Sequence, residues 1–135
     1  MRAPITVRTV QQLLIAIFFS LSLAACSSSA EEFNFDDKTW KNDLNGCKGE
    51  RMKLAPQVED FRMKLLTRKE YVIRGLFGKP DAEELLERSQ KIYIYYITPG
   101  PKCKDASMAG KDQKALTVRF DALGKVREIM VHDAY

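Results

Sequence analysis

The sequence predicts an α+β fold in which two helices pack on one face of a three-stranded antiparallel sheet. Apolar residues recur at every third or fourth position in the middle of the chain and at every second position in its last third. These are the periods of an amphipathic helix and of a strand with one buried face. Short connections favour an antiparallel meander with both helices on the same side, an ααβββ two-layer sandwich.

The first helix is expected between Glu50 and Leu66. Pro56 stands in the middle of this segment. Because proline is tolerated best in the first turn of a helix, the regular helix should begin near that residue. The apolar stripe recurs at spacings of four, three and four residues and consists of Leu54, Val58, Phe61 and Leu65.

The second helix has sequence signals at both ends. Thr67 and Glu70 have the spacing of a capping box, in which the hydroxyl and the carboxylate each accept a hydrogen bond from a free backbone N–H. Gly78 is placed to end the helix in a left-handed conformation, and Pro80 follows just beyond it. The polar segment Asp81–Arg88 is expected to form a turn or a short helix.

Three strands are expected to complete the fold, over Lys91–Ile97, Leu116–Phe120 and Val126–Val131. The first is dense in β-branched and aromatic residues, and the second alternates apolar with polar residues. A turn that ends at Gly124 joins the second strand to the third. The long polar loop Thr98–Gln113 connects the first two.

Alternation along the strands assigns the two faces of this sheet. The side chains expected in the core are Leu116, Val118 and Phe120 on the second strand and Ile92 and Ile94 on the first. Tyr93, Tyr95 and Arg119 should then face outward and form a partner-binding surface, because tyrosine and arginine are enriched in interface hot spots. The alternative is that the two tyrosines only cover the sheet or lie under the loop.

The first 26 residues have the layout of a bacterial lipoprotein signal peptide. Arg2 and Arg8 are the only charges before Glu31, and the apolar segment Leu13–Ala25 is shorter than the roughly 20 residues of a spanning helix. The sequence Leu-Ala-Ala-Cys, ending at Cys26, matches the lipobox. Small residues fit the peptidase, and the thiol of Cys26 takes the diacylglyceryl group. An ordinary signal peptide with an incidental cysteine is the alternative.

The expected domain organisation follows from this signal. Residues 1–25 are the signal peptide, residues 26–45 are the lipidated N-terminus and a tether with Trp40 as packing anchor, and residues 46–135 are a single domain. Acyl chains such as palmitate on Cys26 would anchor the protein to the membrane. Ser27 favours the periplasmic face of the outer membrane, with the inner membrane as the alternative.

Two cysteines remain in the mature chain, Cys47 and Cys103. An even pair in an oxidising compartment predicts a disulfide, and two free buried thiols are the alternative. The two are too far apart for a CxxC motif. His132 is the single histidine, which leaves too few ligands for a zinc site. Neither a metal nor a cofactor is expected.

Charge and motifs argue against a nucleic-acid partner and against an enzyme. Without Arg2 and Arg8, 20 basic residues stand against 18 acidic ones, which leaves no basic footprint. His132 and Asp133 would point to opposite faces of a strand and so form no acid–base pair. The acidic residues of the run Glu83–Glu87 are expected to be a solvated face.

The segment Gly75–Asp81, which reads Gly-Leu-Phe-Gly-Lys-Pro-Asp after a helix, resembles the LLGKP signature of the SmpA/OmlA lipoproteins. Leu116–Val126 is similar to the later strands of that family. The resemblance spans Arg51–Val131 and is that of a divergent member. The family includes the small lipoprotein subunit of the outer-membrane β-barrel assembly machine. The resemblance implies the same fold and a lipoprotein.

Two functions remain open. The first is a non-enzymatic scaffold or binding module that contacts an envelope protein and supports outer-membrane assembly or integrity. The second is an inhibitor or a small-ligand sequestering lipoprotein of the periplasm, since a similar two-layer fold can serve that purpose.

Overall fold

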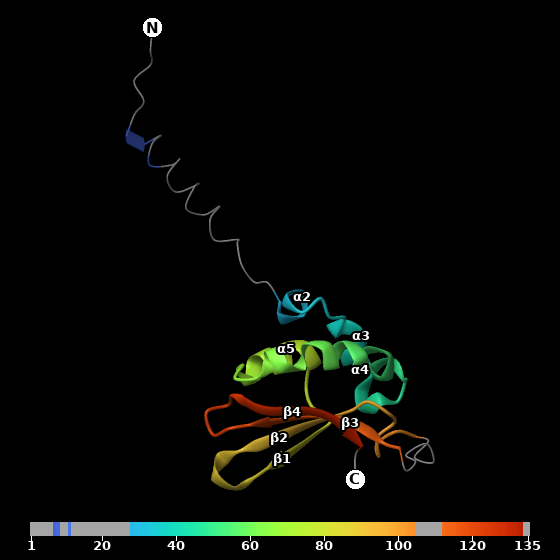
Figure 1. The fold of residues 1–135 in the computed structure, drawn as a ribbon. Helices are drawn as coiled ribbons and strands as arrows, with labels where there is room; N and C mark the ends of the chain where they lie inside the picture. Colours follow the sequence, from blue (N-terminus) through green and yellow to red (C-terminus); the bar gives the residue numbers. More distant parts are fainter. Residues whose placement is uncertain (1–6, 9–10, 12–27, 105–111, 134–135) are drawn as a thin grey trace.

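The computed structural model describes residues 7–8, 11, 28–104 and 112–133. The predicted cleavage site and Cys26 lie outside the described residues, and so does the middle of the loop Thr98–Gln113. The described part has the predicted α+β class, with helices on one side of an antiparallel sheet (Figure 1).

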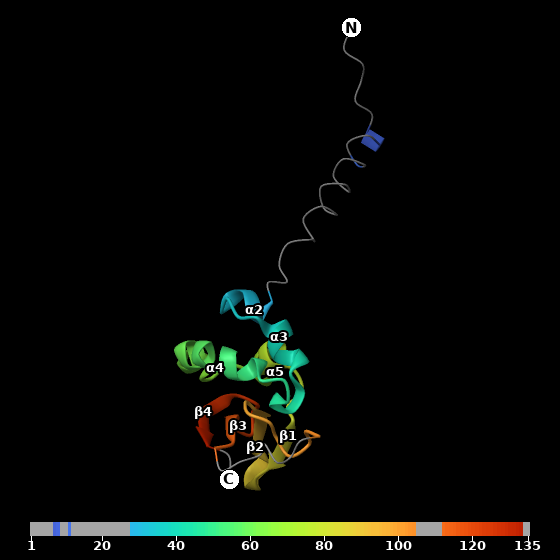
Figure 2. The same ribbon diagram turned by 90° about the vertical axis from the view of Figure 1, so that its right-hand side faces the viewer.

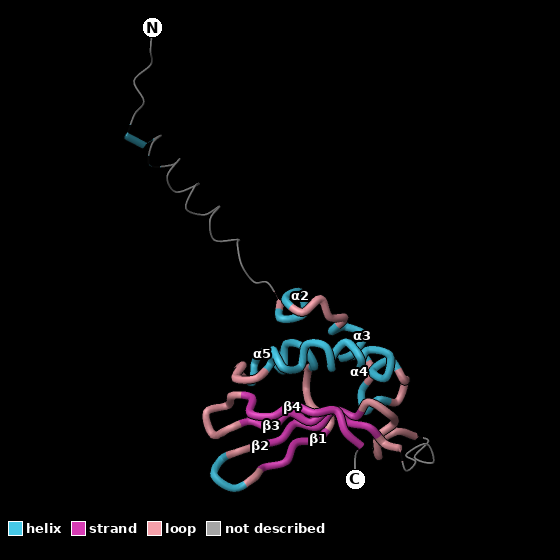
Figure 3. Tube along the Cα trace, viewed as in Figure 1, coloured by secondary structure: helices cyan, strands magenta, loops and turns pink. Residues whose placement is uncertain are grey.

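In the part of the chain that the structure describes, the sheet has four strands rather than the three expected. Its strands are β1 (Ala82–Leu85), β2 (Lys91–Tyr96), β3 (Lys114–Phe120) and β4 (Val126–Asp133). They lie side by side in chain order, and each is antiparallel to the next (Figure 3). The last three strands confirm the meander predicted from alternation.

Strand β1 corrects the expectation of a turn or short helix over Asp81–Arg88. Its side chains are exposed except for the half-buried Ala82, so no apolar period marks it in the sequence. Ala82 lies opposite Ile94, and Leu85 lies opposite Lys91. Backbone pairing with β2 therefore forms this strand, and helical structure is limited to the short 3₁₀ turn η4 (Glu87–Ser89).

Within residues 28–133 as described, four helices lie on one side of the sheet. They are α2 (Ser29–Glu32), α3 (Asp37–Asn42), α4 (Glu50–Phe61) and α5 (Glu70–Phe77). Figures 1 and 2 show α4 and α5 next to the sheet, with α2 on the outer side of this helical layer. The two predicted helices correspond to α4 and α5. Two 3₁₀ turns, η2 (Leu44–Gly46) and η3 (Arg62–Leu65), flank α4.

The expected tether is, over its described part, a piece of the domain. Ala30, Phe35 and Trp40 are buried. The Phe35 ring lies 5.8 Å from that of Trp40 and 5.6 Å from that of Phe77. Trp40 is confirmed as the packing anchor, whereas a domain boundary at residue 46 is wrong. Short helices held by scattered aromatic residues have no period that a sequence pattern could reveal.

The apolar stripe of the first predicted helix is confirmed. Val58, Phe61 and Leu65 are buried, and the fourth member of the stripe is partly buried. The predicted start is wrong, because α4 begins at Glu50 and contains Pro56. Pro56 and the residue one turn earlier, Met52, are both exposed. Water can therefore satisfy the carbonyl that loses its partner.

A long-range cap explains the early start of α4. Asp43 is fully buried, and its two carboxylate oxygens accept hydrogen bonds from the backbone of Lys48 (2.7 Å) and of Arg51 (2.9 Å). Gly49, with φ of 77°, makes the turn between them. A carboxylate at a helix N-terminus satisfies free N–H groups and complements the helix dipole.

The predicted capping box of α5 is not formed. The helix begins at Glu70 itself, and Thr67 has a φ of 65°. The Thr67 N–H donates to the Val126 carbonyl at 2.8 Å, and the Val126 N–H donates to the Arg68 carbonyl at 2.9 Å. Pairing of this segment with β4 replaces the local cap. Gly78 ends α5 with φ of 77° as expected, but its ψ of −157° is extended rather than left-handed helical.

The predicted faces are right for β3 and wrong for β2. Leu116, Val118 and Phe120 are fully buried, as expected. Tyr93 and Tyr95 are also fully buried, because they lie opposite Val118 and Leu116 and cross-strand neighbours share a face. The β2 residues assigned to the core, Ile92 and Ile94, are on the other face and half-buried. The tyrosines fit the core because their hydroxyl groups reach polar partners.

Candidate binding surface

The face of the sheet opposite the helices is the candidate site, and we call it the open sheet face. The strand registers arrange it in three cross-strand rows: Glu84–Ile92–Arg119–Glu128, Ala82–Ile94–Thr117–Met130 and Tyr96–Ala115–His132. Residues of these rows line a hollow of about 370 Å³. None of the four helices covers this face in Figures 1 and 2.

The centre of the open sheet face is apolar. Ile92, Ile94 and Tyr96 follow one another along β2, and all three are half-buried. Met130 on β4 is 41% exposed. The opposite side of β2, which the helices cover, carries Tyr93 and Tyr95. Both sides of this strand therefore bear apolar or aromatic residues, and its sequence alone could not show which side is covered.

Polar side chains border the apolar centre. Arg119 donates to the side-chain oxygen of Gln90 through Nε (3.3 Å) and Nη2 (2.9 Å). The His132 ring contacts the Thr117 hydroxyl at 3.1 Å and the backbone carbonyl of Asp133 at 2.7 Å. These contacts fix two polar side chains in place. The His132 ring therefore contacts the backbone carbonyl of Asp133 and not its carboxylate.

The predicted partner-binding residues are thus separated by the sheet. Arg119 is exposed on the open sheet face, as predicted. Tyr93 and Tyr95 lie in the core between the sheet and the helices, so their assignment to the outward face is wrong. The residues that take their place are Ile92, Ile94, Tyr96 and Met130. The one sequence signal for them was the alternation of β3, since pairing with β3 determines the faces of β2.

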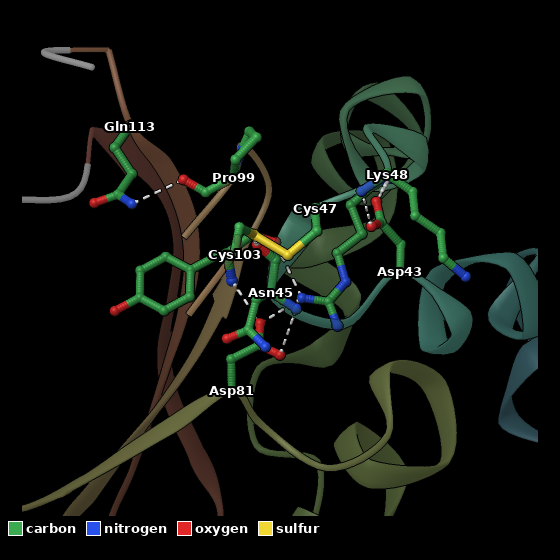
Figure 4. Close-up of a disulfide and its surroundings, with 10 residues drawn as sticks. Asp43, Asn45, Cys47, Lys48, Asp81, Pro99, Cys103 and Gln113 are labelled. Carbon is green, nitrogen blue, oxygen red and sulfur yellow. Dashed lines mark hydrogen bonds and ion pairs between the residues drawn. A yellow bond between two sulfur atoms is a disulfide. The ribbon is translucent and has the colours of Figure 1, made fainter. Parts of the chain in front are cut away.

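A disulfide joins the helical layer to the sheet at one end of this face. Cys47 and Cys103 are bonded, with Cα atoms 5.6 Å apart, which confirms the predicted pair. Figure 4 shows the bond beside the turn at Asn45, whose carbonyl accepts from the Gly100 N–H at 2.8 Å. The disulfide and this hydrogen bond attach the segment that follows β2 to the helical layer.

A buried ion pair lies next to the disulfide. Arg51 and Asp81 side chains are 0% and 2% exposed, and Arg51 Nη1 lies 2.5 Å from Asp81 Oδ2. Arg51 also donates to the carbonyls of Trp40 (3.1 Å) and Tyr96 (3.0 Å). Charged groups are rarely buried without such partners. Sequence reasoning missed this pair, because its members are 30 positions apart and carry no motif.

A second polar cluster lies at the start of α5. The Tyr93 hydroxyl donates to Glu70 and accepts from Arg74 Nη2 at 3.0 Å, and Lys91 Nζ lies 2.6 Å from Glu70. Burial raises the pKa of Glu70, but hydrogen bonds from Lys91 and Tyr93 outweigh it, so that the pKa is lowered. Burial and the bond to Glu70 raise the pKa of Tyr93. Burial raises the pKa of the Tyr95 hydroxyl strongly.

Across residues 28–104 and 112–133 no group of three or more His, Cys, Asp or Glu side chains could hold a metal ion. Among the described helices none is long and apolar enough to cross a membrane.

No family model, no curated protein sequence and no solved structure matches this chain.

Proposed function

We propose that this protein is a lipid-anchored lipoprotein of the bacterial envelope that acts as a scaffold or binding module, without enzymatic activity. The proposed anchor is the acylated Cys26, and the proposed location is the periplasmic face of the outer membrane. The basic start, the apolar segment and the lipobox of the sequence support the anchor. The resemblance of Gly75–Asp81 to the SmpA/OmlA signature supports the class.

The observation that carries the binding role is the open sheet face. An antiparallel sheet commonly has one face on the core and one face in solvent, and a purely solvated face is polar along every strand. Here Ile92, Ile94 and Tyr96 form an apolar line along β2, with Met130 on β4. An apolar centre with a polar border is the usual composition of a protein interface. We therefore place the envelope partner on this face.

The border can orient the partner. Arg119 and Glu128 share one row of the face, and His132 lies in the row at the other end of the hollow. Charged groups at the rim of an interface contribute more to orientation and association rate than to affinity. The apolar centre would then supply most of the binding free energy.

The test is crosslinking in intact cells. Met130→Glu places a charge in the centre of the open sheet face. Leu123→Glu is the matched control, because Leu123 is 72% exposed in the turn between β3 and β4. Met130→Glu should abolish crosslinks to the envelope partner and sensitise cells to detergent and large antibiotics, and Leu123→Glu should do neither. Crosslinks that survive Met130→Glu in a folded protein would place the partner elsewhere.

Sequestration of a small ligand is the second candidate, and the hollow favours it. Its volume of about 370 Å³ falls at the lower end of the range for ligand pockets. In that case Met130→Glu would abolish ligand binding, while deletion of the protein would leave sensitivity to detergent unchanged. The two functions therefore differ in the deletion phenotype.

Anchoring and sorting have separate tests. Cys26→Ala should block acylation and leave an uncleaved precursor, and a variant that still matures at this site would contradict lipidation. Ser27 favours the outer membrane, so the mature protein should fractionate there. Residence in the inner membrane would contradict only the sorting.

A further inference from the structure

The described fold begins almost at the proposed lipid anchor. Cys26 precedes Ser28 by two residues and the buried Ala30 by four. A fully extended chain advances about 3.5 Å per residue, so Cys26 lies within about 7 Å of Ser28 and about 14 Å of Ala30. A domain of about 100 residues has a radius of gyration of about 13 Å. The link from the lipid to the fold is therefore too short for the domain to bring its opposite side to the bilayer.

Helix α2 is attached firmly to the rest of the domain. The Glu31 N–H donates to the Ser28 hydroxyl at 3.4 Å, and the Ser28 N–H donates to the Glu31 carboxylate at 3.3 Å, which forms a capping box. Glu32 pairs with Arg68, which precedes α5. Just after the helix, the ring of Phe33 stacks on that of Phe61 in α4 at 4.9 Å. The segment next to the anchor is therefore held against both α4 and the start of α5.

Helix α2, the described element that follows the proposed anchor most closely in the chain, lies on the side of the domain away from the sheet. In both Figure 1 and Figure 2, α2 lies on the outer side of the helical layer and the sheet lies on its inner side. A side chain added at Gly75 in α5 would lie 3.3 Å from the Ser29 hydroxyl, so α2 packs over the outer surface of α5. The open sheet face is on the opposite side of the molecule.

We infer that the helical layer rests on the bilayer at α2 and that the open sheet face points into the periplasm. This inference depends on the proposed acylation of Cys26. In this arrangement the lipid headgroups contact the outer surface of the helical layer, because the short chain between Cys26 and α2 holds that surface at the bilayer. A partner must then reach the open sheet face from the aqueous side.

The surface beside α2 fits contact with headgroups. Tyr71 is 75% exposed and stands four residues before Gly75, on the outer side of α5 next to α2. Tyrosine suits a membrane interface, since its ring is apolar and its hydroxyl is polar. Of the acidic side chains in this region, Glu32 pairs with Arg68 and Asp37 pairs with Lys41. Glu31 and Asp36 are exposed, so charge does not favour this surface for an anionic bilayer. The lipid anchor rather than net charge holds the surface in place, so the orientation should be insensitive to salt.

The test measures how close each side of the domain lies to the bilayer. The full chain is expressed in a bacterium, and the mature protein is reconstituted in vesicles of phosphatidylethanolamine and phosphatidylglycerol that contain nitroxide-headgroup lipid. A fluorophore is attached, without reductant, to Tyr71→Cys on the helical side or to Met130→Cys on the open sheet face. Quenching at position 71 should exceed quenching at position 130 several-fold, at both low and high salt.

The controls separate the two proposals. A Gly/Ser linker of about 20 residues, inserted before Ser28, has a reach of roughly 25 Å and should make the quenching at the two positions similar. Lys38→Cys on the exposed side of α3 replaces Tyr71→Cys if that variant does not fold. Equal or stronger quenching at position 130 without the linker would overturn the orientation while leaving the anchor intact. A protein without acyl mass that stays off the vesicles would overturn the anchor, and the orientation with it.

Discussion

Asp81 Oδ2 accepts a hydrogen bond from Arg51 Nη1 at 2.5 Å, and both side chains are buried from solvent. The same carboxylate accepts hydrogen bonds from the backbone N–H groups of Asn45 (3.0 Å) and Tyr96 (2.8 Å). One side chain therefore ties the start of α4, the turn η2 and the end of β2 together. Figure 4 shows both Asp81 and the disulfide close to the turn at Asn45. Through its bond to Tyr96 it holds the end of β2 that lines the open sheet face.

Removal of this carboxylate should destabilise the protein strongly. Asp81→Ala leaves the Arg51 charge buried without its counter-ion, and such a change costs about 3–5 kcal/mol of unfolding free energy. Glu50→Ala is the control, since it removes an exposed pair with Lys53 and should cost less than about 1 kcal/mol. Urea unfolding of the two variants measures both values. Equal losses would mean that water reaches the buried pair.

Loss of the disulfide should cost a large part of the total stability. The bond closes a loop with a sequence separation of 56, for which chain entropy gives an upper value of about 4 kcal/mol. Replacement of Cys47 and Cys103 by alanine should lower the unfolding free energy by about 2–4 kcal/mol. Reductant should lower the stability of the parent protein similarly and leave the variant unchanged. A parent protein indifferent to reductant, or labelled by a thiol reagent before reduction, would refute the bond.

Substitution of Gly78 should be more harmful than substitution of Gly49. Both have φ of 77°, but Gly78 has an extended ψ of −157° that favours glycine almost exclusively. A Cβ at Gly78 would also lie 3.0 Å from Lys41 Cγ, whereas Gly49 has open space. Thermal unfolding should show a loss of about 1–3 kcal/mol for Gly78→Ala and about 1 kcal/mol for Gly49→Ala. An unchanged midpoint for Gly78→Ala would mean that α5 can end elsewhere.

Stability should depend on the ionisation of Glu70. Its pKa is lowered in the folded protein, because hydrogen bonds from Lys91 and Tyr93 outweigh burial. The stabilisation it provides is therefore present above its unfolded pKa of about 4.3 and is lost as the pH falls through the lower folded value. The difference in unfolding free energy between the parent protein and Glu70→Gln should shrink between pH 7 and pH 3. Glu83→Gln, on the exposed strand β1, provides the comparison. A constant difference would show that Glu70 acts through packing alone.

The sequence by itself determined the features that depend on local periodicity and on simple counting. The stripe of α4 and the alternation of β3 each bury one side because a period of 3.6 or 2 places apolar residues there whatever they pack against. Gly78 after a helix predicted a positive φ. The two cysteines that follow Cys26 allowed a single intramolecular pair. These predictions needed no knowledge of neighbours in space.

The tertiary structure decided the features that depend on a partner far along the chain. Strand β1 forms because its backbone hydrogen-bonds to that of β2. Helix α5 begins at Glu70 because the backbone of Thr67 is hydrogen-bonded to β4. The faces of β2 are apolar on both sides, so that only its register with β3 puts Tyr93 in the core. Arg51 and Asp81 could not be recognised as a pair, since the free energy of a buried charge is set by what surrounds it and no local pattern encodes those surroundings.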